Sequence, residues 1–177
     1  MATEEFIKLL NQGVNGWNKW RESNPDMRGV DLSEIQLEEL DLTGIDLSMV
    51  NLRGANLQNI NLASANLRGA DLSMANLRSI DLVGANLSAA HLSMICLGEA
   101  NLSGVNLSGA DLRGANLRLS KLDRADLSNT KLNMANLSGT SMIGAILIGA
   151  NLSRAELKNA NLAGTDFSRA NLSEADL

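Results

Sequence analysis

The stretch ANLQNINLASANLRG, residues 55–69, contains one five-residue unit three times in succession. Its leucine continues in both directions, because every fifth position from Leu32 to Leu177 is leucine apart from Met142 and Phe167, without an insertion or deletion. Residues that recur in such strict registration occupy one repeated local environment, which is typical of a fold built by stacking a small unit. The sequence therefore predicts an all-β solenoid rather than a globular domain with one central core.

Each position of the unit has its own character. Two positions before the leucine, the residue is mostly alanine or a larger aliphatic residue, and one position before it is Asp or Asn in 22 of 30 units. Residues two apart in an extended chain point to the same side, so alanine and leucine are predicted to face inward and Asp or Asn outward. We expect these outward side chains to bond to their neighbours in adjacent coils.

The last two positions of the unit are predicted to turn the chain. Glycine recurs there and supplies the backbone freedom that a repeated bend requires. These glycines include Gly54, Gly84, Gly104, Gly109 and Gly114. An amphipathic helix is excluded for this region, because a period of five drifts steadily around a helix of 3.6 residues per turn.

Residues 1–28 do not follow the five-residue period and predict a helix over 4–21. Thr3 is placed to cap its start, and Asn24 with Pro25 ends it. Gly13 and Gly16 weaken this helix, so docking must hold it in place. Its apolar residues recur mostly three and four positions apart, as an amphipathic helix requires: Phe6, Leu10, Val14, Trp17 and Trp20.

A solenoid needs its ends covered, because an open end exposes core side chains and unpaired strand edges. We therefore interpret the helix as an N-terminal cap, docked through Phe6, Leu10, Trp17 and Trp20. Bulky residues replace alanine in the first coil and predict a wider apolar end to receive it: Val30, Ile35, Leu40, Ile45 and Val50. The alternative is a helix on a membrane surface, for which the polar face has few cations.

The unit resembles the A-[DN]-L-x-x motif of the pentapeptide-repeat family, which Ala55-Asn56-Leu57 and Ala125-Asp126-Leu127 match directly. The opening segment, with Trp17-Asn18-Lys19-Trp20-Arg21, is similar to the start of cyanobacterial members that have an N-terminal capping helix. The resemblance implies a right-handed four-sided parallel β-helix with 20 residues per coil. It implies a cap and linker over residues 1–28 and about 30 pentads over residues 29–177.

Catalysis is not expected from this sequence. Its one histidine and one cysteine, His91 and Cys96, fall on adjacent faces, so neither can activate the other, and they fall short of the usual four zinc ligands. We expect no enzyme activity, no metal and no cofactor. No segment is apolar enough to span a bilayer, no secretory signal opens the chain and no disulfide can form internally, which predicts a cytoplasmic protein without membrane attachment.

A coil of 20 residues places Asp71, His91 and Asp111 in one outward column, with Lys131 next. Carboxylates on both sides favour a charged imidazole. His91 is interpreted either as one more polar residue in the stack of outward side chains or as a pH-sensitive contact, since histidine titrates near neutrality.

The charge pattern bears on nucleic acids and their mimics. Some members of the family imitate duplex DNA and bind gyrase, a type II topoisomerase, through long acidic faces. Here acidic residues concentrate in the first coil, and from Asn51 to Leu177 the balance is 11 basic against 10 acidic residues. This interrupts a continuous acidic face, and there is no basic stripe for direct nucleic-acid binding. A gyrase-binding DNA mimic is therefore kept as the alternative function.

Two outward apolar features predict contact surfaces. The Ile patch consists of Ile143, Ile146 and Ile148 on two adjoining faces, and the Met set consists of Met74, Met94 and Met134 at one position of one face. The alternative explanation of both is sequence variation that the repeat tolerates, without any role in binding. The favoured interpretation is a non-enzymatic interaction module with an unidentified protein partner. The C-terminal end has no visible cap, so a homodimer through that end is also predicted.

Overall fold

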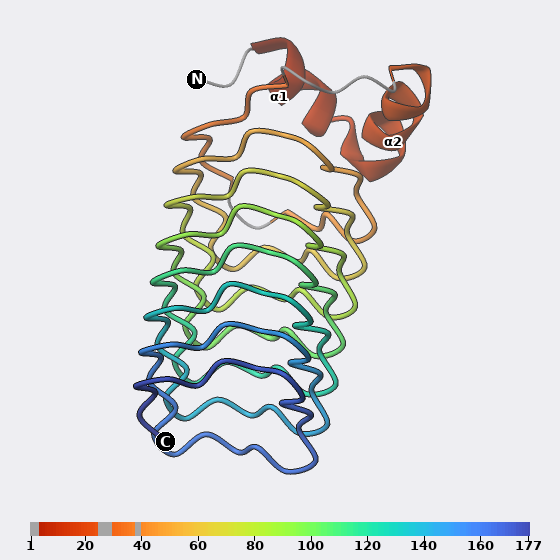
Figure 1. Ribbon diagram of the computed structural model, residues 1–177. Helices are drawn as coiled ribbons and strands as arrows, with labels where there is room; N and C mark the ends of the chain where they lie inside the picture. The colour runs from red at the N-terminus through yellow and green to blue at the C-terminus, as the bar shows by residue number, and fades with distance from the viewer. Residues whose placement is uncertain (1–3, 25–29, 38–39) are drawn as a thin grey trace.

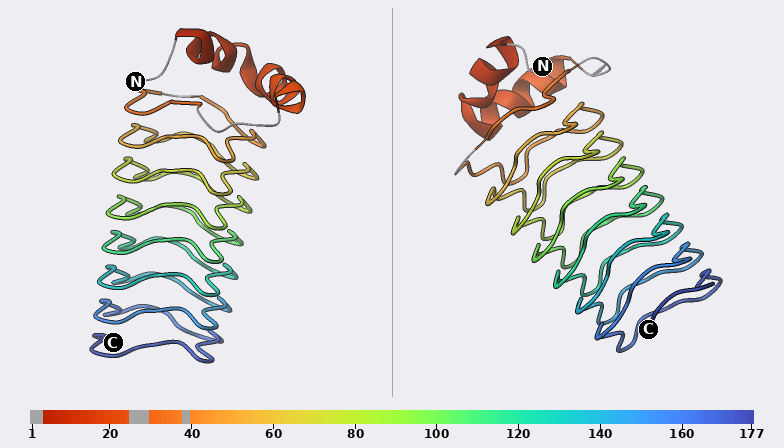
Figure 2. Two further views of the ribbon diagram at one scale, coloured as in Figure 1. Left: turned by 45° about the horizontal axis from the view of Figure 1, so that its top comes forward. Right: turned by 90° about the vertical axis from the view of Figure 1, so that its left-hand side faces the viewer.

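The computed structural model describes residues 4–24, 30–37 and 40–177. Two helices, α1 (Glu4–Leu10) and α2 (Gly13–Ser23), lie over one end of a rod of stacked coils (Figure 1). The chain then descends through the coils to Leu177 at the far end, and the coils stay parallel and evenly spaced along the rod (Figure 2). In the described part of the chain, β-structure consists of single bridge residues rather than longer strands.

The bridges fix the size of the coil. Each is parallel and joins residues 20 positions apart, as Asp31 with Asn51 and Asn51 with Asp71. With one bridge residue in every five, a coil contains four pentads and has four sides. The predicted four-sided parallel β-helix is therefore confirmed in its register.

Leucine and alanine fill the interior, as predicted. Leu72 and Ala75 are both buried, and the same pattern of burial repeats from Val30 to Leu157. Leu162, Phe167 and Leu172 in the last coil are only partly buried, because no further coil covers them in the structure. Dense stacking of small and branched aliphatic side chains along an axis replaces the central core of a globular domain.

A left-handed residue ends every described pentad. Its φ lies between 55° and 72° throughout, and in most pentads the next N–H donates to the leucine carbonyl, as Ala55 N to Leu52 O at 3.0 Å. Gly54 and Gly104 occupy this position as predicted, but so do Met74 and Arg124. A non-glycine residue tolerates positive φ at a modest cost, so the stacked coils hold the turn whichever residue is present.

The outward Asp and Asn side chains act mainly within their own turn. In most described pentads the side-chain Oδ1 accepts the backbone N–H two residues later, as Asp71 Oδ1 from Ser73 N at 2.9 Å and Asn86 Oδ1 from Ser88 N at 3.1 Å. The expected bonds to the adjacent coil also occur but are fewer; Asn51 Nδ2 to Asp31 Oδ1 at 3.0 Å is one. This local bond pairs a backbone N–H that takes no part in the hydrogen bonds between adjacent coils.

The expectation of one helix over 4–21 is wrong, because the helix breaks between Leu10 and Gly13. Gly13, the first residue of α2, has a φ of +81°, so the chain changes direction where α2 begins. α2 ends at Ser23, with Asn24 as its C-terminal cap. The predicted roles of Thr3 and Pro25, and the boundary between residues 28 and 29, lie outside the described residues.

We predict that Gly104→Ala lowers the free energy of unfolding by about 1 kcal/mol, because alanine is strained at positive φ. The φ of Gly104 is +65° and no atom lies within 4 Å of an added Cβ, so the effect is purely conformational. Gly98 precedes a turn residue and lacks positive φ, and an added Cβ would meet only Arg118 O at 3.6 Å. Gly98→Ala is the matched control and should be neutral or slightly stabilising in urea unfolding. Equal losses in both variants would contradict this account of the turn.

Candidate interaction surfaces

An aromatic cluster holds the two helices of the cap together. The ring centroids of Phe6 and Trp20 lie 5.6 Å apart, those of Trp17 and Trp20 5.7 Å apart, and those of Phe6 and Trp17 6.4 Å apart. Trp17 and Leu10 are buried, and Phe6 and Trp20 pack partly buried against the same core. The structure thus brings all four predicted docking residues to the end of the rod.

Polar side chains of α2 also pair with the open backbone edge of the first coil. Asn18 Oδ1 accepts the Asp46 N–H at 2.9 Å, and Trp17 Nε1 donates to Asp46 O at 2.7 Å. Arg21 Nη2 donates to Ser48 O at 3.2 Å and to Ser48 Oγ at 2.7 Å. In later coils the same kind of backbone N–H pairs with the preceding coil, as Asn66 N with Ile45 O. Along this side, α2 therefore takes the place of a coil.

Sequence reasoning missed Asn18 and Arg21, because the apolar periodicity of a helix carries no information on which polar residues meet a distant backbone. Arg21 is only 8% exposed, and its Nε lies 3.3 Å from Asp46 Oδ2. That contact is an ion pair without hydrogen-bond geometry, since neither Nε nor Nη1 has a hydrogen-bond partner. The buried charge makes the position of α2 specific to this side of the coil.

The same contacts perturb Asp46. Burial by itself raises the pKa of this carboxyl, but hydrogen bonds from Ser48 and the adjacent positive charge of Arg21 outweigh burial and hold its pKa below the ordinary 3.8. Elsewhere in the first coil, hydrogen bonds from Ser33 lower the pKa of Asp31 to about 2. Both carboxylates are therefore more readily ionised in the folded chain than in the unfolded chain.

The Ile patch lies near the far end of the rod. Ile143, Ile146 and Ile148 are 44%, 40% and 37% exposed, whereas the isoleucines at inward positions, such as Ile80 and Ile95, are buried. Ile146 occupies the Asp/Asn position and forms bridges with Asp126 and Asp166 in the coils on either side. The patch is an apolar interruption of a polar ladder.

The Met set runs along one corner. Met74, Met94 and Met134 are 64%, 68% and 68% exposed, and all three have positive φ at the end of their pentads. Gly114 separates Met94 from Met134. A Cβ added at Gly114 would lie 2.7 Å from Met94 Sδ, so the thioether covers the space that this glycine leaves. Packing over the next coil thus accounts for part of the exposed methionine surface.

The predicted column is present in the backbone, with bridges from Asp71 to His91 and from His91 to Asp111. Its carboxylates are engaged elsewhere. Asp71 Oδ1 accepts the Ser73 N–H, and Arg113 Nη2 lies 2.7 Å from Asp111 Oδ2, which holds the pKa of Asp111 below its ordinary value. Within the described residues the His91 imidazole has no hydrogen bond or ion pair. The pH-sensitive contact stays a prediction.

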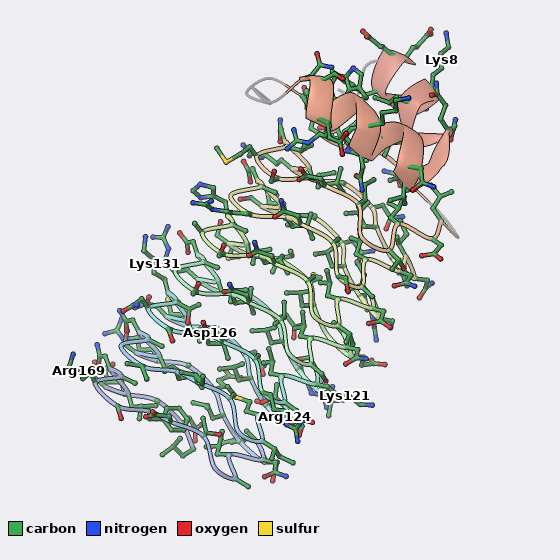
Figure 3. The ribbon with its side chains drawn as sticks, turned by 90° about the vertical axis from the view of Figure 1, so that its right-hand side faces the viewer. Lys8, Lys121, Arg124, Asp126, Lys131 and Arg169 are labelled. Carbon is green, nitrogen blue, oxygen red and sulfur yellow. The ribbon has the colours of Figure 1, made fainter. Side chains whose placement is uncertain are left out.

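Charges of both signs are distributed along the rod. Figure 3 shows Lys8 on the cap, Lys121 and Arg124 along one edge, and Lys131 and Arg169 along the opposite edge. Several charges are neutralised between adjacent coils; Arg154 with Glu174 at 2.9 Å and Lys158 with Asp176 at 2.6 Å are examples. Alternating charge of this kind does not produce a sustained potential of one sign over a face.

Neither a metal centre nor a membrane span emerges from residues 4–24, 30–37 and 40–177. Among them, no three His, Cys, Asp or Glu side chains are grouped so that they could hold a metal ion. Neither of their helices has the length and apolar character required to cross a membrane.

A family model described as Pentapeptide repeats matches the chain in 8 copies, over residues 45–82, 80–118, 120–159 and 150–177. The chain belongs to the pentapeptide-repeat family. Members of this family fold as right-handed quadrilateral β-helices, and the register of 20 residues agrees with that architecture. The chain is thus a repeat protein whose flat faces form a scaffold.

Solved structures of pentapeptide-repeat proteins are similar to this one. HetL from Nostoc, a protein involved in heterocyst differentiation regulation, is 30% identical over 100% of this chain and 95% of its own, with a TM-score of 0.40. A plasmid-mediated fluoroquinolone resistance protein, QnrB1, is 23% identical over 83% of this chain and 77% of its own, with a TM-score of 0.76. The likeness to QnrB1 shows the fold alone. No curated protein matches the chain.

Loss of a single indole N–H should loosen the cap of this pentapeptide-repeat rod. Trp17→Phe keeps a buried ring but leaves Asp46 O unpaired and a small cavity, so we expect a loss of about 2 kcal/mol in chemical unfolding. Trp20→Phe is the matched control, because no hydrogen bond of its indole is found among the described residues, and it should cost clearly less. A larger loss for Trp20→Phe would contradict the role given to the Trp17 bond.

Acid should release the cap before it unfolds the coils. Asp46 and Asp31 have lowered pKa values when folded, so the stabilisation from each is present above the ordinary pKa of 3.8 and is lost as the pH falls through its folded pKa, which for Asp31 is about 2. Both tryptophans of the chain lie in α2, so their fluorescence reports on the cap. Thermal melts between pH 7 and pH 2 should show a shallower loss for Asp46→Asn than for Asp126→Asn, which lies in the same column away from the cap. Identical profiles for the two variants would refute the assignment to Asp46.

Proposed function

We propose that this pentapeptide-repeat rod is a non-enzymatic interaction scaffold that binds a protein partner through the Ile patch. The exposure of Ile143, Ile146 and Ile148 on a mostly polar surface supports the proposal most directly. Contiguous apolar surface is unfavourable in water unless a partner covers it. Ile146 strengthens the argument, because most other pentads have Asp or Asn at that position and isoleucine gives up their turn hydrogen bond.

Backbone geometry at the patch suits a close contact. Gly144 and Gly149 follow Ile143 and Ile148, both with positive φ, so no side chain rises from these two corner positions. A Cβ added at Gly164, in the next coil, would meet only Gly144 atoms, at 3.9 Å. Because glycine occupies these corner positions, another chain can approach the backbone beside the Ile patch. The coils that carry the patch are packed against one another, which keeps the entropic cost of binding low.

We also propose a homodimer through the C-terminal end. The N–H groups of Leu162, Phe167 and Leu172 form no hydrogen bond within the described residues, whereas the corresponding N–H groups of earlier coils are paired, as Leu122 N is with Ser141 O. These three side chains are also only partly buried. An open β-edge beside a half-covered core is a surface on which a second copy can pair.

The DNA-mimic alternative, a binder of gyrase, has weaker support. Its requirement is a continuous acidic face. Arg113 with Asp111 at 2.7 Å and Arg78 with Glu99 at 3.0 Å show carboxylates neutralised along the rod. Asp41 and Asp46 of the first coil lie beside α2 instead of along the rod.

Restoring the repeat pattern should abolish partner binding without harming the fold. In the triple variant Ile143→Ser, Ile146→Asn and Ile148→Ser, each position takes a residue common there in the other coils. We expect unchanged thermal stability and loss of the bound protein in affinity capture from cells that produce the chain. The control variant Met74→Ser with Met94→Ser alters the other apolar surface. Retention of the same partner by the triple variant would reject the Ile patch as its docking site.

Sedimentation over a concentration series tests the dimer separately. We expect the wild type and the triple variant to dimerise alike, because the proposed contact is the open edge of the last coil. A monomer at every concentration for the wild type would refute the C-terminal dimer and leave the Ile patch proposal intact.

A further inference from the structure

Cys96 cannot form the local side-chain bond that most described turns use. In the coils on either side, Asn76 Oδ1 accepts the Arg78 N–H at 3.3 Å and Asn116 Oδ1 accepts the Arg118 N–H at 3.1 Å. Cysteine has no carbonyl oxygen in its side chain, and the equivalent Gly98 N–H has no hydrogen-bond partner within the described residues. Because this N–H points away from the stacking ladder, it is available to a ligand.

A hollow lies over that N–H. The bridges of Cys96 with Asn76 and Asn116 place Arg78, Gly98 and Arg118 in one column, two positions after each bridge residue. Glycine leaves the middle of the column empty between two long cationic side chains. The result is a hollow of about 260 Å³, lined by both arginines, Gly98, Cys96, Asn116, Glu99 and Leu119.

The groups around the hollow are mostly hydrogen-bond donors. The Arg118 guanidinium and the side-chain amide N–H groups of Asn116 have no partner among the described residues, and neither does the Gly98 backbone N–H. Arg78 keeps further N–H groups beyond the Nη2 that contacts Glu99 Oε1 at 3.0 Å. Glu99 is the one acidic residue in the lining, and this contact already occupies it.

Other pentads without Asp or Asn do not combine these features. After His91, the Ser93 N–H also lacks a side-chain acceptor among the described residues. The neighbours of Ser93 in its column are Ser73 and Arg113, and the Arg113 guanidinium binds Asp111 through Nε and Nη2. An unpaired N–H between two arginines is therefore a feature of the Gly98 turn.

We propose that the hollow at Gly98 binds a phosphate-type oxyanion. Arg78 and Arg118 line the hollow from the coils on either side of Gly98, and the Gly98 N–H lies between them in the column. A tetrahedral anion can accept hydrogen bonds from several directions at once. Charge-assisted bonds from guanidinium groups to such oxygens are among the stronger polar contacts in proteins. Glu99 competes with the anion for Arg78 and so limits affinity. This site is separate from the Ile patch, and its occupancy does not depend on the proposed protein partner.

Titration of the ¹⁵N-labelled full chain with inorganic phosphate tests the site, with sodium chloride holding ionic strength constant. We expect saturable shifts of the backbone amide signal of Gly98 and of the side-chain amide signals of Asn116. Cys96→Asn restores the repeat residue, whose Oδ1 would take the Gly98 N–H, and should weaken binding about tenfold with the fold unchanged. Arg118→Gln should weaken it comparably.

Glu99→Gln separates a binding role from a structural one. Removing the competing carboxylate should tighten phosphate binding several-fold, whereas a purely structural contact between Arg78 and Glu99 predicts no gain. Absence of saturable shifts at Gly98, equal shifts with sodium chloride alone, or unchanged affinity in Cys96→Asn would each overturn the proposal.

Discussion

The backbone hydrogen bond between adjacent coils is the constraint on which the structure depends. Leu72 N donates to His91 O at 2.8 Å, Leu92 N donates to Asp111 O at 2.8 Å, and Asp111 N returns a bond to Ala90 O at 2.9 Å. Each bond uses main-chain atoms, so the stacking survives a change of the outward side chain. His91, Cys96 and Ile146 replace Asp or Asn without disturbing the register. The outward side chains can therefore differ from coil to coil while the backbone of the rod stays the same.

The left-handed turn residue is the second constraint, and it shapes the corners. A side chain there leaves the coil at a fixed angle, and a long one lies over the next coil when that coil has glycine. A Cβ added at Gly139 would meet Leu119 Cδ2 at 2.8 Å, and one added at Gly69 would meet Met49 Sδ at 2.6 Å. Exposed apolar residues at these corners thus have a packing partner, whereas Ile146 lies at a bridge position and has none of this kind. That difference is why the Ile patch is the better candidate for a contact with another protein.

The two ends of the rod solve the problem of an open edge differently. At the first coil, Trp17, Asn18 and Arg21 supply donors and an acceptor from side chains where a preceding coil would supply backbone groups. A helix can do this only where its side chains have the right reach, and α2 does so along the side that contains Asp46 and Ser48. At the last coil the corresponding N–H groups of the described residues remain open.

The sequence by itself determined the solenoid, the inward leucine and alanine, the turn position of Gly54 and Gly104, and the apolar face of the cap. All of these are local, since each follows from the spacing of residues that are close together in the sequence. The four-sided coil came from family resemblance alone, because a period of five is compatible with any number of pentads per coil. Tertiary structure decided what depends on residues 20 or more positions apart. It joined Arg21 to Asp46 and gathered Arg78, Gly98 and Arg118 around one hollow, because the docking of α2 and the stacking of the coils determine which distant side chains meet.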